Sequence, residues 1–286
     1  RGPPRTTRAG RRVPVQPRAG ATSADALDHD DGMVNIGVAT TARTPPPPPS
    51  PLSPPSLAAT PIPAARGVGS RAKTTVRAFL RGRTLVLTGA TGFLAKVFLE
   101  KLLWEQPDVR KVFLIITPRA GKSAAVRLAE IVDSPLFDRL RTRHGVGFQT
   151  FLDSLLVPVA GDLGAEGLGL SREDEAAIVA EAEVVVNSAA TTSFNERFDV
   201  AVNINSLGPR RLMRLARRCP NMLLMCHVST AFANGLRQGP ARERAFRIGD
   251  CVARELDPAG DVPVLNPYAE IELALEAGRA AAAEAE

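Results

Sequence analysis

The sequence predicts an α/β fold in which a doubly wound parallel sheet follows a disordered N-terminal tail. Three observations lead to this prediction. From Phe79 onward, short apolar runs alternate with amphipathic stretches, which is the pattern of a parallel sheet covered by helices. The first of these runs ends in a pair of glycines, Gly89 and Gly92. Before Phe79 there is no aromatic residue, so that segment buries too little apolar surface to offset the entropy of ordering it.

The composition of the chain changes at about residue 78. Of the 24 prolines, 14 lie in residues 1–63, and residues 1–78 carry 11 Lys and Arg against 4 Asp, a net charge of +7. Residues 79–286 carry 25 basic against 26 acidic residues, so the overall charge of +6 belongs to the tail. Because the remainder is nearly neutral and has no basic patch interleaved with aromatic residues, we do not expect nucleic-acid binding.

The first 24 residues contain six Arg and no acidic residue, a composition that resembles an organelle transit segment. Composition alone does not distinguish plastid targeting from mitochondrial targeting. No apolar run reaches the ~18 residues of a membrane span, so no transmembrane segment is expected. The three cysteines have no metal-ligand spacing, which indicates a reducing compartment and no metal site.

Five short runs rich in Val, Ile and Leu predict the strands of the sheet. They lie at residues 84–88, 111–116, 155–160, 184–187 and 222–228. Between them, apolar residues with helical spacing predict helices at residues 93–103, 124–132, 171–180 and 200–218. Ser171 is the expected N-cap of the third helix, with Glu173 and Asp174 in its first turn. The sheet domain therefore covers residues 79–230, and residues 231–286 form an insertion region that ends in a helix of alanine and glutamate.

The first strand, its glycines and the helix that follows predict a dinucleotide cradle. Gly89 permits the tight turn, Gly92 lets the backbone approach a pyrophosphate, and the small Ala95 lets the helix pack closely on the sheet. Backbone N–H groups at the helix start then face the phosphates. The spacing Thr-Gly-x-x-Gly-x-x-Ala is that of short-chain dehydrogenases. The alternative is a glycine-rich turn that binds nothing.

The ends of the next strands predict how the rest of a cofactor is held. An acidic residue usually binds the ribose hydroxyls of NAD after the second strand. This chain has Arg119 there, which suits a 2′-phosphate and favours NADPH over NADH. The alternative is a solvated loop arginine. After the third strand, the Asp162 carboxylate is placed to accept from the adenine amino group. After the fourth, the small residues 187–190 let the backbone pass along the cofactor.

The fifth strand ends in His227, Ser229 and Thr230, where short-chain dehydrogenases place a hydroxyl that binds the substrate carbonyl. The proton donor in those enzymes is a Tyr, with a Lys four residues later that lowers its pKa. Here the only tyrosine is Tyr268, and Glu272 follows it; a carboxylate would raise the pKa of the phenol. We therefore interpret Tyr268 as a loop residue, and His227 as a buried or half-buried residue with its polar groups satisfied.

Four motifs, at residues 88–101, 161–163, 187–197 and 227–232, resemble the plant alcohol-forming fatty acyl-CoA reductases of the plastid male-sterility type. The resemblance implies a Rossmann fold of the extended short-chain dehydrogenase type and a plastid location, with mitochondrion or cytoplasm as alternatives. It also implies NADPH-dependent reduction of a fatty acyl-CoA or acyl-ACP thioester to an aldehyde and then to a primary alcohol. In this family the Tyr-x-x-x-Lys follows an insert, so we expect it beyond Glu286 and expect residues 1–286 to be inactive.

The resemblance also assigns roles residue by residue. The residues implied at the pyrophosphate are Gly89, Ala90, Thr91, Gly92, Phe93 and Leu94. Those implied along the adenine and ribose are Asp162, Leu163, Asn187, Ser188, Ala189 and Ala190, with Arg119 at the 2′-phosphate. The implied catalytic residues are the carbonyl-binding hydroxyls of Thr230 and Ser229, and Asn205 in the hydrogen-bond network.

Two other functions stay open. One is a catalytically silent NADP-binding protein, and the other is a different extended short-chain dehydrogenase, such as a sugar-nucleotide or hydroxysteroid oxidoreductase. One further feature is a basic stripe on the predicted helix 200–218. We interpret it as a solvated face, with docking of an acidic carrier protein as the alternative. The stripe consists of Arg210, Arg211, Arg214, Arg217 and Arg218.

Overall fold

The structure, a computed structural model, describes residues 75–235, 237–244, 250–262, 264 and 266–284. It contains a five-stranded parallel sheet with the strand order β3-β2-β1-β4-β5, so the predicted doubly wound fold is confirmed. The strands are β1 (Thr84–Thr88), β2 (Lys111–Ile116), β3 (Leu156–Ala160), β4 (Val184–Asn187) and β5 (Leu224–His227). Most of the tail that we predicted to be disordered lies outside the described residues.

Helices connect the strands and continue beyond them. They are α1 (Val76–Leu80), α2 (Phe93–Glu105), α3 (Ala124–Val132), α4 (Asp138–His144), α5 (Phe148–Leu155), α6 (Arg172–Glu181), α7 (Phe198–Val202), α8 (Gly208–Arg218), α9 (Val252–Leu256) and α10 (Pro267–Glu284). Short 3-10 turns lie at Pro135–Phe137, Gly145–Gly147, Glu166–Gly169 and Ala231–Asn234, and a π-helical turn at Asn203–Leu207. In the described part of the chain, no helix is both long enough and apolar enough to cross a membrane.

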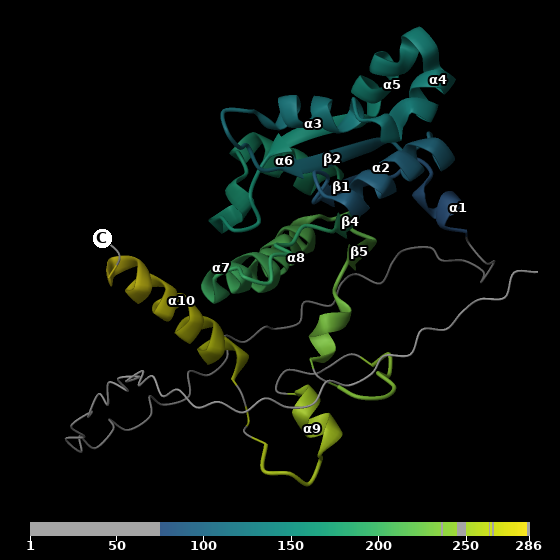
Figure 1. The fold of residues 1–286 in the computed structure, drawn as a ribbon. Helices are drawn as coiled ribbons and strands as arrows, with labels where there is room; N and C mark the ends of the chain where they lie inside the picture. Colours follow the sequence, from purple (N-terminus) through teal and green to yellow (C-terminus); the bar gives the residue numbers. More distant parts are fainter. Residues whose placement is uncertain (1–74, 236, 245–249, 263, 265, 285–286) are drawn as a thin grey trace, which may run out of the picture. The chain divides into compact units, whose positions relative to one another are not determined.

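The sheet buries both of its faces, as parallel sheets do. Alternate residues of β1 point to opposite sides: Leu85 and Leu87 pack with α2, α3, α4 and α5, whereas Val86 packs with α6 and α8. Figure 1 shows α2 and α3 on one side of the strands and α8 on the other. This alternation explains why all five residues of β1 are buried. It also explains why continuous apolar runs in the sequence predicted strands.

The predicted helix at residues 200–218 is interrupted. It begins at Phe198 and divides into α7, the π-helical turn and α8. Its apolar periodicity runs through the interruption, so the pattern predicted one helix. Helices α4 and α5 were not predicted either. The chain passes from α5 into β3 without a loop, and Leu155, the expected first residue of the third strand, is the last residue of the helix.

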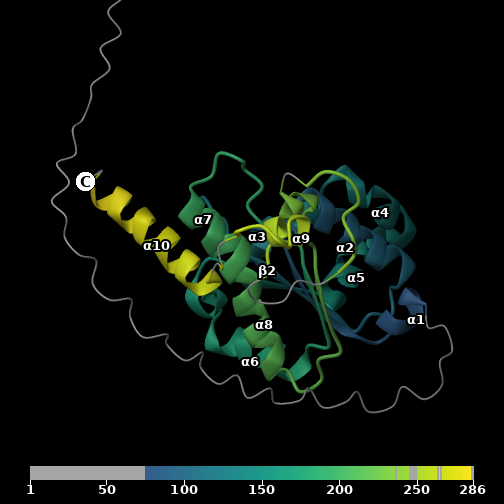
Figure 2. The same ribbon diagram turned by 90° about the horizontal axis from the view of Figure 1, so that it is seen from below.

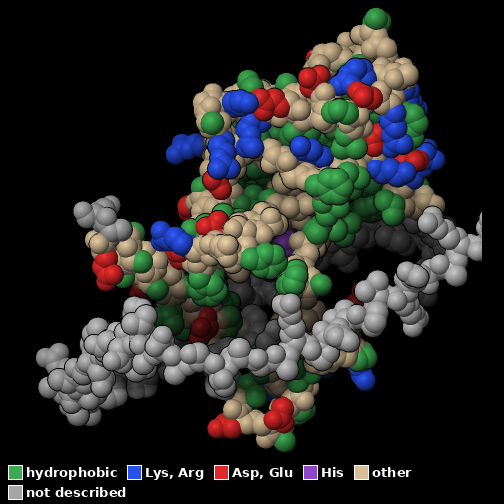
Figure 3. Space-filling model, in the orientation of Figure 1, with side chains coloured by type: hydrophobic (Ala, Val, Ile, Leu, Met, Phe, Trp, Pro, Cys, Tyr) green, Lys and Arg blue, Asp and Glu red, His purple; other side chains and the backbone are tan. Residues whose placement is uncertain are grey.

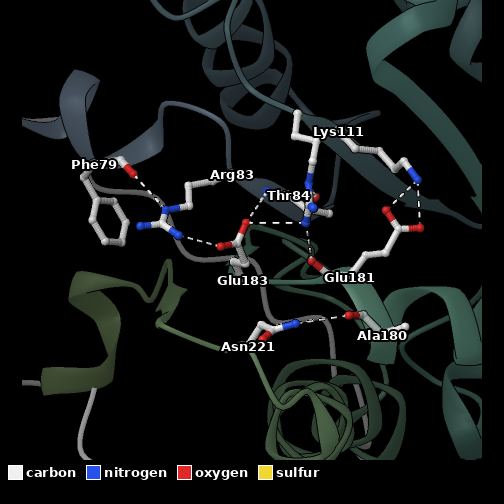
Figure 4. A network of polar contacts seen from close by, with 9 residues as sticks. Phe79, Arg83, Thr84, Lys111, Ala180, Glu181, Glu183 and Asn221 are labelled. Atoms are coloured by element: carbon white, nitrogen blue, oxygen red, sulfur yellow. Dashed lines mark hydrogen bonds and ion pairs between the residues drawn. The ribbon is translucent and has the colours of Figure 1, made fainter. Parts of the chain in front are cut away.

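Polar side chains join the amino ends of the strands, opposite the edge expected to hold a cofactor (Figure 4). The Glu183 carboxylate accepts from the Arg83 guanidinium at 2.6 Å and from the backbone N–H of Thr84 at 3.0 Å. Nearby, Lys111 pairs with Glu181 at 2.6 Å. These contacts tie β1, β2 and the segment between α6 and β4 together at the amino end of the sheet.

The region after β5 contains α9 and α10. Helix α10 packs beside α7 in both ribbon views (Figures 1 and 2), and the Arg197 guanidinium donates to the Gly278 carbonyl at 3.1 Å. The Asn266 side chain accepts from the N–H of Tyr268, and Tyr268 is the second residue of α10. Our prediction that Tyr268 is a loop residue is therefore wrong: Asn266 caps a helix that already includes it.

The charges of the folded part are mixed. On the face drawn in Figure 3, Lys and Arg side chains lie among Asp and Glu side chains. Several are paired at close range, for example Arg77 with Glu105 at 2.8 Å and Lys101 with the same carboxylate at 2.8 Å. This pairing is in keeping with the near-zero net charge of residues 79–286.

Candidate cofactor-binding site

The register of the sheet brings the predicted site residues to one edge. Thr88 at the end of β1 lies beside Ile115 of β2 and Asn187 of β4, and Asn187 lies beside His227 of β5. The segments that follow these strands therefore leave the sheet side by side. In open α/β sheets, this carboxyl edge is where ligands bind.

Gly89 turns the chain from β1 toward α2. Its φ is +77°, in the left-handed region, and a Cβ atom here would lie 2.7 Å from backbone atoms of Ser188 and Ala189. Both facts require glycine. The loop after β1 thus lies directly against the loop after β4, and the N–H of Gly92 closes the turn by donating to the Gly89 carbonyl at 2.8 Å.

The start of α2 is open to a ligand. Gly92 is its N-cap, and no side chain among the described residues caps this helix start. Ala90 and Ala95 are buried, whereas Phe93 is 84% exposed and Leu94 and Thr91 are also exposed. Uncapped N–H groups at the start of a helix bind phosphate. The residues present therefore fit the pyrophosphate of a dinucleotide.

Three polar side chains, those of the buried Thr88 and Asn187 and the exposed His227, form a bridge across the strand ends. The Thr88 hydroxyl donates to the Asn187 side-chain oxygen at 2.5 Å and accepts from the N–H of Ala189 at 3.2 Å. The Asn187 side-chain nitrogen lies 2.9 Å from Nδ1 of His227. Because an amide nitrogen only donates, Nδ1 is the acceptor and the ring proton is on Nε2. The side chain of Asn187 is thus used within the sheet and orders the loop at Ser188–Ala190 by way of Thr88.

His227 differs from its prediction in burial. It ends β5 and its Nδ1 has a partner, as expected, but the residue is exposed. The reason is its position: β5 is the last strand in the sheet order of the described residues, so one side of it has no neighbouring strand.

The loop after β3 carries the residues predicted at the adenine. Asp162 is exposed, and one of its carboxylate oxygens accepts from the N–H of Gly164 at 2.7 Å. Leu163 is buried. This contact closes a tight turn in which the Asp162 side chain is bonded to the backbone two residues later. The second carboxylate oxygen has no hydrogen bond within the described part of the chain.

Arg119 lies on a tight turn after β2. Its backbone pairs with Lys122 in both directions, at 3.2 and 3.0 Å, across Ala120 and Gly121, which both have positive φ. The exposed guanidinium has no hydrogen bond or ion pair with any described residue, whereas Lys122 pairs with Glu130. Arg119 is therefore an exposed cation on a hydrogen-bonded turn after β2, with no partner for its guanidinium among the described residues.

The predicted carbonyl-binding hydroxyls follow β5. Ser229 and Thr230 are exposed, and the Thr230 hydroxyl accepts from the N–H of Phe232 at 3.2 Å. A hydroxyl that accepts one hydrogen bond keeps its own proton for another. Thr230 thus caps a 3-10 turn and is still able to donate to an oxygen atom.

Asn205 holds the loop after β4. Its side chain accepts from the N–H of Thr191 at 2.9 Å and donates to the carbonyl of the same residue at 3.0 Å. Both polar atoms of the amide are therefore engaged with one backbone unit. The geometry supports a role for Asn205 in ordering the loop next to the cofactor edge.

The basic stripe is not uniformly a solvated face. The side chain of Arg211 is only 14% exposed and donates to backbone carbonyls of other segments. The guanidinium of Arg210 lies over the Tyr268 ring, 5.4 Å from its centroid, and Arg218 pairs with Glu175. The solvated-face interpretation is thus wrong for Arg211. Helical spacing alone could not reveal this, because the partners of Arg211 are Leu163 in the loop after β3 and Asn203 in the π-helical turn.

The fold and the site together define a doubly wound domain with a cradle that fits the phosphates of a dinucleotide. The family model described as "Male sterility protein", an NAD-binding family, matches residues 87–278. The chain belongs to this family. The resemblance seen in the four motifs is thereby confirmed.

Two relatives illustrate the similarity. The chloroplastic fatty acyl-CoA reductase 2 of Arabidopsis thaliana is 41% identical over 220 residues, which are 77% of this chain and 36% of the relative. The alcohol-forming fatty acyl-CoA reductase of Simmondsia chinensis is 36% identical over 174 residues, 60% of this chain and 35% of the relative. The chain thus spans about a third of the length of these relatives. Among solved structures, the terminal R domain from the myxalamid PKS-NRPS biosynthetic pathway matches at 25% identity and a TM-score of 0.45, covering 66% of this chain and 40% of that one.

Proposed function

We propose that this protein takes part in the NADPH-dependent reduction of fatty acyl thioesters, carried on CoA or acyl carrier protein, to primary alcohols. The relatives are named as fatty acyl-CoA reductases, and one of them as alcohol-forming. The observation that carries the proposal is the close contact of Gly89 with the loop after β4, next to the uncapped start of α2. It forms a phosphate site at the same sheet edge as the hydroxyls of Ser229 and Thr230.

The residues divide the chemistry between them. When bound, NADPH would supply a hydride twice: the first reduction converts the thioester to an aldehyde as the thiolate of CoA or the carrier protein leaves, and the second converts the aldehyde to the alcohol. Transfer of a hydride to a carbonyl carbon leaves negative charge on the oxygen, and a hydroxyl of Thr230 or Ser229 stabilises it by donating a hydrogen bond. Neither hydroxyl is acidic enough to protonate the oxygen efficiently. We propose that the proton comes from a tyrosine with a lysine four residues later, a pair that residues 1–286 do not contain.

The preference for NADPH over NADH rests on Arg119. Its guanidinium has five donors in a planar fork, which suits bidentate binding of a phosphate. Its position after β2 is where an acidic residue would otherwise bind the ribose hydroxyls. The lack of an internal partner for this cation among the described residues favours this proposal over a structural role.

Turnover tests the proposed reaction. We expect no measurable NADPH oxidation by residues 1–286 with a long-chain acyl-CoA, because loss of a positioned general acid costs about 10²–10⁴-fold. A longer protein that includes the Tyr-x-x-x-Lys should be active. Thr230→Ala should abolish most of that activity, and the matched control Thr230→Ser, which keeps the hydroxyl, should retain it. Robust turnover by residues 1–286 would contradict the proposed proton donor, and Tyr268 would then be the residue to test in that role.

We also propose a plastid location. Support comes from the Arg-rich, acid-poor residues 1–24 and from the chloroplastic relative. A fluorescent reporter fused to residues 1–75 should enter plastids of a plant cell. Mitochondrial fluorescence would favour the alternative address, and diffuse cytosolic fluorescence would contradict organelle import altogether.

A further inference from the structure

A π-helical turn at Asn203–Leu207 separates α7 from α8. In such a turn the backbone N–H bonds reach one residue further back than in an α-helix, and these turns recur at functional sites. Here the N–H of Gly208 donates to the carbonyl of Asn203. The wider turn presents two asparagine side chains, Asn203 and Asn205, to two different loops at the cofactor edge.

Asn203 contacts the loop after β3. Its side-chain nitrogen donates to the Gly164 carbonyl at 2.9 Å. Its side-chain oxygen accepts from the guanidinium of Arg211 at 2.8 Å. The amide of Asn203 therefore links the loop to a cation on α8.

Arg211 contacts the same loop directly. One guanidinium nitrogen donates to the Leu163 carbonyl at 3.0 Å and to the Asn203 carbonyl at 3.2 Å. Only 14% of its side chain is exposed, and its ion-pair contact is Glu166 at 3.7 Å, a carboxylate that is itself 86% exposed. The short contacts of this nearly buried guanidinium thus go to backbone oxygens. Charged donors make stronger hydrogen bonds than neutral ones.

Close packing adds to these bonds. A Cβ atom at Gly208 would lie 3.0 Å from the Cβ of Leu163, so α8 approaches the loop as closely as a glycine allows. The carbonyls of Leu163 and Gly164 are both bound from the helix side, while the carboxylate of Asp162, one residue earlier, is fixed by the N–H of Gly164. The backbone around Asp162 is therefore held at two successive peptide groups.

We propose that Arg211 and Asn203 are positioning residues that hold the loop of Asp162 and Leu163 ready for the adenine half of the dinucleotide. The inference rests on the proposed NADPH binding. A loop held before binding does not have to be ordered when the ligand arrives, so the ligand binds more tightly. The two residues act through the loop backbone and do not need to touch the ligand.

The test compares ligands that contain or lack the adenine half. Binding of NADPH, adenosine 2′,5′-bisphosphate and reduced nicotinamide mononucleotide is measured by calorimetry on the 286-residue chain. The variants are Arg211→Lys, whose single ammonium does not span both acceptors, and Asn203→Asp, which keeps the acceptor for Arg211 and loses the donor to Gly164. The matched control is Arg214→Lys, one turn further along α8, where the exposed guanidinium has no partner among the described residues.

We expect both variants to bind NADPH and the adenosine bisphosphate about 10-fold more weakly, the size of one lost hydrogen bond. Binding of the mononucleotide should not change, and the control should match wild type for every ligand. Wild-type affinities for the adenine ligands in both variants, or equal losses for all three ligands, would overturn the positioning role alone. A wild-type chain that binds neither NADPH nor the bisphosphate would instead overturn the proposed function. If Arg211→Lys does not fold, Asn203→Asp decides by the same criteria.

Discussion

Gly89 and Gly82 share a left-handed backbone but differ in their surroundings. The φ of Gly89 is +77° and that of Gly82 is +66°. A Cβ at Gly82 would meet no atom within 4 Å, whereas a Cβ at Gly89 would lie 2.7 Å from the backbone of the loop after β4. Conformation and crowding are therefore separable at these two positions.

Alanine substitutions should measure the two effects. Gly82→Ala should lower the free energy of unfolding by about 1 kcal/mol, the cost of the left-handed conformation alone. Gly89→Ala should lower it by at least about 3 kcal/mol, because strain and overlap with another backbone add. Urea denaturation of both variants checks this. Equal losses would mean that the loops after β1 and β4 are not in contact as described.

Gly92 differs from Gly89 in its backbone conformation and in its surroundings. Its φ is −83°, which any residue adopts, and the nearest atom to an added Cβ is the Gly89 carbonyl oxygen at 3.2 Å. A side chain at this position therefore needs no unusual backbone conformation, but the turn at Gly89 must shift by a few tenths of an ångström to admit its Cβ. The side chain would still occupy the space through which a pyrophosphate approaches the backbone.

The strands that the sequence predicted best are those whose residues are mostly buried. Strands β1, β2 and β4 have the expected bounds, because their apolar runs end where the chain leaves the sheet. Ser171 caps α6 as predicted, since its hydroxyl accepts from the N–H of Asp174 at 3.0 Å, a contact made within four residues.

Elements that depend on distant partners were not predictable from a pattern. The π-helical turn is accompanied by contacts of Asn203 with Gly164, 39 residues earlier in the chain. The exposure of His227 follows from the place of β5 in the sheet order, and local sequence says nothing about that. For the candidate site, motifs in the sequence predicted the cradle and the hydroxyls. The contacts of Asn203 and Arg211 could be identified only from the three-dimensional structure.

The polar cluster at the amino ends of the strands allows a test of element packing. Glu183→Ala removes the acceptor for Arg83 and for the N–H of Thr84, and its side chain is only 13% exposed. We expect the free energy of unfolding to fall by about 2 kcal/mol, the range for hydrogen bonds to a charged group. Urea denaturation is again the measurement.

Glu181→Ala is the matched control for this test. Glu181 also pairs with a cation, Lys111, but both side chains are about one-third exposed. Exposed pairs contribute less than about 1 kcal/mol. A loss for Glu181→Ala as large as that for Glu183→Ala would show that the Glu183 contacts do not anchor β1.

For the molecule as a whole, the proposed function assigns cofactor recognition and reaction chemistry to different parts of the sheet edge. In that proposal the segments after β1, β2 and β3 bind the phosphates and adenine, and the segment after β5 provides the hydroxyls. The side chains of Asn187 and Asn205 order the loop after β4, which lies between the segments assigned to the cofactor and the segment with the hydroxyls. Dinucleotide binding should therefore be a property of this chain even where turnover is not.

Calorimetric titration of the 286-residue chain with NADPH, for wild type and Gly92→Val, tests this most directly. We expect wild type to bind NADPH, and to bind it more tightly than NADH because of Arg119. Gly92→Val should remain folded, with a small fall in its thermal unfolding midpoint because the turn at Gly89 must shift slightly, and it should lose NADPH binding because the side chain occupies the space through which the pyrophosphate approaches. Unchanged NADPH affinity in a folded Gly92→Val protein would contradict the phosphate cradle at the start of α2.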